Sequence, residues 1–127
     1  MKNKSILLLT LVMLLVAGAC KRYNKIFETE LLKAVFSNNI FEVEILLRSG
    51  INVNALDKNW DTPLILASSQ GNLKIIQFLL DNGADINFQN LIGETALITA
   101  CRIGHFEIVE LLIKKGATID TQDYRGK

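Results

Sequence analysis

The sequence predicts an all-α solenoid of stacked helix-turn-helix units with short β-hairpin loops, preceded by a signal peptide. Three observations predict it: a self-similarity with a period of 33 residues, helix start and stop signals repeated in each period, and an apolar segment at the beginning. The chain has 127 residues, 50% of them hydrophobic, with 2 Cys, 1 His and a formal net charge of +1. This composition excludes a disordered chain, a disulfide scaffold and a strongly basic nucleic-acid-binding protein.

Residues 1–19 have the three-part anatomy of a secretory signal peptide. Lys2 and Lys4 form a short positive region, residues 6–16 are rich in Leu, and three small residues follow at 17–19. A permanent transmembrane helix is the weaker alternative, because the apolar run is shorter than the ~20 residues that span a hydrocarbon core. Cleavage leaves 12 basic and 13 acidic residues, and therefore a net charge of −1.

The segment Val16-Ala17-Gly18-Ala19-Cys20 resembles the lipobox of bacterial lipoproteins, in which cleavage leaves the Cys as a lipid-bearing first residue. We expect Cys20 to be lipidated, because several acyl chains at about 0.8 kcal/mol per buried CH₂ anchor a protein stably. Residues 20–23 then form a short tether, and the expected location is the bacterial cell envelope. The alternative is an unmodified periplasmic or secreted protein, since Ala17-Gly18-Ala19 also satisfies the A-x-A cleavage rule.

The rest of the chain, residues 24–127, repeats the same residue types at intervals of 33. Three such sets are Gly50, Gly83 and Gly116; Asn54, Asn87 and Asp120; and Ala34, Ala67 and Ala100. They divide this part into units 24–56, 57–89 and 90–122, and residues 123–127 begin a fourth loop. Because one helix pair cannot bury its apolar face alone, we expect the units to stack.

Local signals inside the second unit predict two helices. Thr62 and Pro63 suit the N-cap and the first position of a helix that should end near Gln70-Gly71, where Gly supplies a left-handed conformation. A second helix is predicted over 73–81, because Leu73, Ile76, Leu79 and Leu80 fall at helical spacing. Residues 84–89 alternate between polar and apolar types and predict a hairpin. The third unit repeats these signals over residues 93–117.

These units resemble ankyrin repeats. Thr62-Pro63-Leu64 with Ala67 matches the family's T-P-L-H-x-A, and Leu79-Leu80 with residues 82–85 matches its L-L-x-x-G-A-D. The resemblance covers about residues 24–127, with a degenerate first unit in which Asn38-Asn39 replaces Gly-His. It implies a binding module that uses no cofactor and recognises a protein partner.

The chain departs from the family pattern at two informative places. Ile65 and Ile98 replace a His, so we expect apolar packing instead of the polar network that joins neighbouring units. Trp60 replaces a turn Gly, so either Asn59 or Trp60 must adopt an unfavourable backbone angle.

No residue constellation predicts catalysis. His105 and Glu107 are two positions apart and point to different helix faces, so they cannot share a metal ion, and no phosphate loop or activated nucleophile is present. We therefore expect no enzyme activity, no metal, no small-molecule substrate and no nucleic-acid partner. His105 is expected to form a structural turn, and Cys101 to be a small buried core residue.

The family resemblance implies a concave strip formed by the loop tips and the first helix of each unit. The candidate partner-binding residues are Lys58, Asn59, Trp60, Asp61, Ser69, Leu91, Ile92, Glu94, Arg102, Tyr124 and Arg125. Of these, Trp60, Leu91, Ile92, Tyr124 and Arg102 are the expected anchors, with Asp61 and Glu94 at the rim. The alternative is that Trp60 folds back onto the neighbouring hairpin and the other apolar residues are scattered.

The resulting functional hypothesis is an exported, membrane-anchored protein that holds a protein partner. Two alternatives remain open: an inhibitory or protective envelope protein of the immunity type, and a secreted effector that binds host proteins. The sequence also predicts an exposed apolar flank on the helix pair that ends at Lys114-Lys115.

Overall fold

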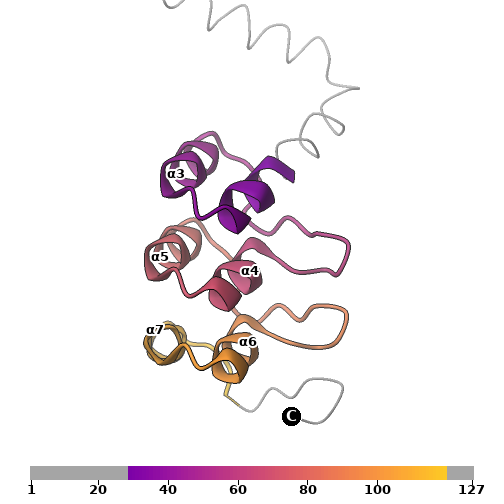
Figure 1. The fold of residues 1–127 in the computed structure, drawn as a ribbon, viewed down its shortest axis with the longest axis vertical. Coiled ribbons are helices and arrows are strands. Elements are labelled where there is room, and N and C mark those ends of the chain that lie inside the picture. Colours follow the sequence, from indigo (N-terminus) through magenta and orange to yellow (C-terminus); the bar gives the residue numbers. More distant parts are fainter. Residues whose placement is uncertain (1–28, 120–127) are drawn as a thin grey trace, which may run out of the picture.

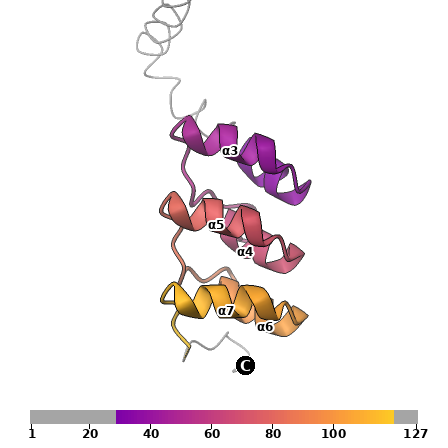
Figure 2. The ribbon, with the colours of Figure 1, turned by 90° about the vertical axis from the view of Figure 1, so that its left-hand side faces the viewer.

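The computed structural model describes residues 29–119, which form three stacked helix pairs (Figure 1). The helices are residues 29–36, α3 (Ile40–Arg48), α4 (Pro63–Gln70), α5 (Leu73–Asp81), α6 (Ala96–Ile103) and α7 (Phe106–Lys114). The second helices α3, α5 and α7 form one row, and the loops between pairs project together on the opposite side (Figures 1 and 2). The expected signal peptide, the Cys20 lipidation site, Tyr124 and Arg125 lie outside the described residues.

Short-range signals set the helix bounds, as the sequence predicts. The Thr62 side chain accepts a hydrogen bond from the Ile65 N–H, Pro63 opens α4, and Gly71 ends it with a φ of 82°. The predicted range of α5 agrees with the observed helix, which Asn72 caps by accepting from the Ile75 N–H. In the first unit Asn38 takes the place of the helix-ending Gly and adopts a φ of 58°.

The loops have the shape of hairpins but contain no β-strand among residues 29–119, so the expectation of β-hairpins is wrong in this respect. The reason is that side chains take the backbone donors. In the third unit one Asn90 oxygen accepts from the N–H groups of Ile92 and Glu94, at 3.1 and 2.9 Å. One backbone bond, from the Asn90 N–H to the Glu94 carbonyl, closes the loop. Such side-chain turns replace a strand ladder.

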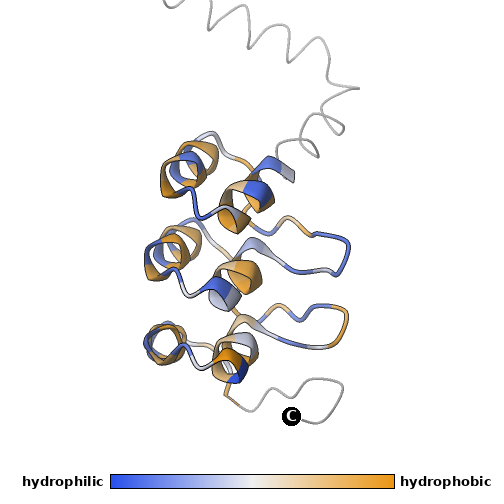
Figure 3. Cartoon of the chain, viewed as in Figure 1, coloured by the Kyte–Doolittle hydropathy of each residue, from blue (hydrophilic) through white to orange (hydrophobic). Residues whose placement is uncertain are grey.

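Apolar residues at equivalent positions form one continuous core through the stack (Figure 3). Leu31, Leu64 and Leu97 are all buried, as are the three Ala residues of the 33-residue register. Ile75 is also fully buried, although the predicted apolar face of α5 does not include it. The core therefore depends on contacts between units rather than on any single helix pair.

Polar contacts also join neighbouring units, in addition to the apolar packing of the buried Ile65. At the start of each loop, the side-chain oxygens of Asn54 and Asn87 accept from the N–H groups of Asp85 and Thr118, both at 2.8 Å. At the opposite edge, Gln70 Nε2 donates to the Phe36 carbonyl at 2.6 Å. Replacing the family's His by Ile therefore does not remove polar connections between units.

His105 joins the second and third units. It precedes α7 but makes no side-chain cap; its Nε2 instead lies 3.1 Å from the Ser69 carbonyl. The ring covers Gly71 so closely that a Cβ built there would lie 2.8 Å from the ring carbon Cε1. His105 therefore has a structural role, as expected, but its side chain contacts the preceding unit instead of capping its own helix.

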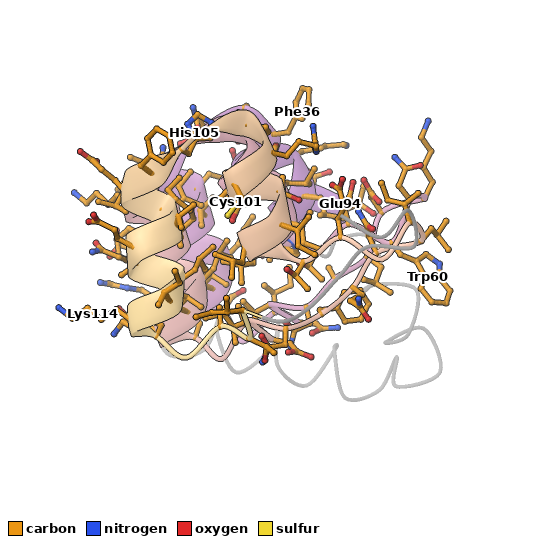
Figure 4. All side chains as sticks on the ribbon, turned by 90° about the horizontal axis from the view of Figure 1, so that it is seen from below. Phe36, Trp60, Glu94, Cys101, His105 and Lys114 are labelled. Atoms are coloured by element: carbon orange, nitrogen blue, oxygen red, sulfur yellow. The ribbon has the colours of Figure 1, made fainter. Side chains whose placement is uncertain are left out.

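Cys101 is exposed, so the expectation that it belongs to the core is wrong. The equivalent residue of the second unit, Ser68, is buried because α6 packs on α4. No further helix pair within residues 29–119 covers α6, and Cys101 faces the viewer when the stack is seen from this end (Figure 4). The apolar side chains of Ile103, Phe106 and Ile113 are exposed as well, as expected for this flank.

No helix in the described part of the chain is long and apolar enough to span a membrane.

The contact between His105 and Gly71 gives a prediction with a matched control. Gly71→Ala and Gly104→Ala both place a Cβ at a left-handed position, which costs about 1–2 kcal/mol. Gly71→Ala should lower the free energy of unfolding further, because its Cβ collides with the His105 ring, whereas nothing lies near Gly104. Urea unfolding of both variants measures the difference. Equal losses, or no recovery when His105→Ala is added to Gly71→Ala, would contradict the contact.

Candidate functional site

A groove runs between the projecting loops and the first helices of the units. One hollow of this groove, of about 370 Å³, lies between the second and third units. Seven of the predicted residues line this hollow: Asn59, Asp61, Ser69, Leu91, Ile92, Glu94 and Arg102. A second hollow, of about 750 Å³, lies toward the first unit and is lined by Lys58. Asn59, Asp61 and Leu66 line both hollows, so the groove is continuous across them.

The loop of the second unit is built around the Asp57 carboxylate. One oxygen accepts from the N–H groups of Asn59 and Asp61, at 2.8 and 2.9 Å. This turn puts Trp60 at a φ of 61°, whereas the equivalent Gly93 has a φ of 80°. Of the two residues expected to adopt the unfavourable angle, Trp60 is the one that does. A bulky residue in the left-handed region marks local strain.

Three large apolar side chains stand at the tips of the two loops. The exposed fractions are 51% for Trp60, 51% for Leu91 and 47% for Ile92, and Trp60 lies at the outer end of its loop (Figure 4). The Leu91 N–H donates to the Asn59 carbonyl at 3.2 Å, which fixes one loop against the other. The apolar side chains of the expected ridge that lie within the described residues are therefore half-exposed.

Glu94 is only 3% exposed, so its expected place at an accessible rim is wrong. Arg102 reaches back from α6, and its guanidinium nitrogens lie 3.1 and 3.3 Å from the two Glu94 carboxylate oxygens. The Thr99 hydroxyl donates to the same carboxylate at 3.3 Å. Arg102 is thus the internal partner of a buried acid and still exposes about half of its side chain to the groove.

Asp61 is half-buried where the two hollows meet. One carboxylate oxygen accepts from Asn90 Nδ2 at 2.7 Å, which joins the second loop to the third. Burial raises the pKa of the Asp61 carboxyl above its ordinary value; the Asn90 hydrogen bond opposes this rise, and the nearby Asp57 and Glu94 carboxylates add to it.

Sequence reasoning missed Phe36, which lines the second hollow and is 73% exposed. Phe36 is separated from Ser69 by 33 residues, and Ser69 from Arg102 by the same interval. Phe36 therefore occupies in the first unit the position that Ser69 and Arg102 occupy in the second and third units. Toward the first unit, the groove is thus lined by the aromatic side chain of Phe36.

The geometry has the features of a binding platform. Across residues 29–119, no group of three or more His, Cys, Asp or Glu residues is arranged to hold a metal ion. The stacked helix pairs and aligned loops instead define a helical-repeat solenoid, a class of fold that offers extended surfaces for contact with another macromolecule.

Two overlapping stretches of the sequence, residues 8–90 and 31–123, match the family model for ankyrin repeats (3 copies). Because these matches cover more than half of the chain, the chain belongs to the ankyrin repeat family. A comparison with curated proteins gave no match. Ankyrin repeats are in general protein-protein interaction modules, and they are typically non-catalytic.

Trp60→Gly should keep the fold intact. Relief of the left-handed strain, about 1–2 kcal/mol, offsets the greater freedom of Gly in the unfolded chain, about 0.5–1 kcal/mol. The free energy of unfolding, measured in urea, should therefore stay unchanged or rise by up to about 1 kcal/mol. A loss of more than about 1 kcal/mol would mean that the indole stabilises the fold by packing.

Asp61→Asn should stabilise the protein near neutral pH. A raised folded-state pKa means that the contribution of Asp61 to stability is complete at low pH and is lost as the pH rises through the folded pKa. Asn is neutral and keeps an oxygen for Asn90. Melting temperatures should show a gain at about pH 7 that disappears toward about pH 3, where Asp61 is protonated in both states. A gain of equal size at both pH values would contradict this cause.

Proposed function

We propose that this chain is an exported binding module that holds a protein partner in the groove, at a membrane surface. The observation that carries the proposal is a continuous groove lined by the half-exposed Leu91 and Ile92, with the half-exposed Trp60 on the tip of the neighbouring loop. Large apolar side chains at a rim are costly to leave in water, and buried aromatic and aliphatic anchors dominate protein interfaces.

The groove is held in shape before a partner arrives. The Asn59-Leu91 backbone bond and the Asn90-Asp61 side-chain bond fix the second and third loops to each other. His105 fixes the helix ends of the same two units. A partner therefore orders few groups of this chain when it binds, which lowers the entropy cost of association.

Export and anchoring are part of the proposal and rest on the sequence of the first twenty residues. The expected mature chain begins at Cys20 with acyl chains on its sulfur and amino group, and the short tether 20–23 keeps the repeats near the membrane. Protein recognition at an envelope also accommodates an inhibitory or protective role, in which the chain neutralises a toxin or protects an envelope enzyme.

Mass spectrometry of the N-terminus tests the anchor. We expect a first residue Cys20 carrying lipid, and recovery of the protein in the membrane fraction. Cys20→Ser should move it to the soluble fraction or leave its signal peptide uncleaved. An unmodified mature protein in the culture medium would contradict anchoring and would favour the secreted effector.

Capture of the partner tests the groove. The double variant Trp60→Ala with Ile92→Ala removes two anchors and should reduce recovery of membrane-fraction proteins on the tagged chain at least tenfold, since each lost anchor costs about 1 kcal/mol or more. Circular dichroism should show unchanged helicity, because both side chains are at loop tips.

Phe106→Ala is the matched control, because Phe106 is a large exposed apolar residue on α7, away from the loops. It should leave recovery unchanged. Equal recovery with the double variant and with wild type would overturn the assignment of the groove.

A further inference from the structure

We propose that the groove selects partners that present an Arg or Lys side chain flanked by apolar residues, and that the Asp61 carboxylate receives this cation. The inference rests on the proposed function and specifies the chemistry of the partner. It is drawn from a comparison of two units of the same chain.

Asp61 and Glu94 occupy the same position in successive units, 33 residues apart. In the third unit the acid is neutralised from within, because the Arg102 guanidinium contacts both Glu94 oxygens. In the second unit the position equivalent to Arg102 is Ser69, whose short side chain donates instead to the Leu66 carbonyl at 2.7 Å. The second unit thus has the acid without the arginine.

Lys33, Lys58 and Arg102 also line the groove, but none of these cations forms an ion pair with Asp61. The Asp61 side chain accepts a hydrogen bond from the neutral amide of Asn90, and among residues 29–119 the structure contains no ion pair to Asp61. Lys33 is paired with Glu30 at 2.9 Å. Asp57 lies nearby and adds negative charge, but its Oδ1 accepts two backbone N–H groups of the loop. A half-buried carboxylate in this position is complementary to a cationic group from outside.

The surroundings of Asp61 suit the rest of such a side chain. Ser69 lines the same hollow as Asp61, so the space that an arginine would fill from within is open to a partner. Ile65, Leu66 and Ile92 also line it and can pack against the aliphatic stem of Arg or Lys. Leu91, which lines the hollow, and Trp60 on the neighbouring loop tip expose apolar surface that the residues flanking the cation can contact.

A random-peptide library displayed on phage is the probe, with the purified full chain as bait. Peptides selected by wild type should be enriched in Arg or Lys beside apolar residues. Asp61→Asn should lose this enrichment and bind a selected peptide at least tenfold more weakly, as expected for loss of a charge-assisted hydrogen bond. Asp81→Asn, a control carboxylate exposed on α5, should leave the affinity unchanged.

Two different failures are distinguishable. If selected peptides depend on Trp60 and Ile92 but show no cationic preference, or bind Asp61→Asn as well as wild type, the cation inference is overturned and the groove remains a binding site. If no selected peptide is sensitive to the Trp60→Ala and Ile92→Ala double variant, the proposed function fails.

A second variant tests the site without any partner. Ser69→Arg copies the arrangement of the third unit and should supply the missing guanidinium from within. It should raise the melting temperature of wild type, leave that of Asp61→Asn unchanged, and block the selected peptides. The same change in melting temperature in both backgrounds would mean that Asp61 does not accept the cation, which overturns the inference.

Discussion

Each helix pair in the described stack completes the burial of its apolar surface against a neighbouring pair. This constraint explains why buried residues such as Leu31, Leu64 and Leu97 recur every 33 positions. The same constraint explains why the hydrophobic core extends along the whole stack. It also explains the alignment of the loops, since helices in register carry their connections in register (Figure 1). The groove is therefore a product of the stacking, and no single unit contains it.

The proposed binding features lie where the units differ. The backbone of the second and third loops is organised in the same way, by Asp57 in one and Asn90 in the other. Where the third unit has Gly93, the second has Trp60, which exposes its indole at a strained backbone angle. Where the third unit has Arg102, the second has Ser69, so Asp61 has no arginine beside it. A repeat sequence thus allows candidate functional positions to be found as exceptions to the pattern of the other units, even from a single chain.

The sequence predicts well what short-range chemistry determines. The bounds of α4 and α5 follow from Thr62, Pro63, Gly71 and the apolar spacing, and the exposure of the loop tips follows from turn residues. It fails where the outcome depends on more distant groups. Glu94 is buried because Arg102 folds back from eight residues away, and the absence of strands follows from side chains capturing backbone donors. Cys101 is exposed because it lies on the side of α6 that no further helix pair within residues 29–119 covers. Its residue type alone does not indicate this position.

The bonds that join the units all link residues of adjacent units, such as Asn54 to Asp85 and Asn87 to Thr118. Duplication or deletion of one complete unit would therefore keep equivalent positions of neighbouring units aligned, whereas insertion of one residue in a helix would shift all later positions out of alignment. The fold of such a chain therefore tolerates a change in the number of units better than a change in the length of one unit. Binding surface can in this way be gained in whole increments, each with its own loop to diversify.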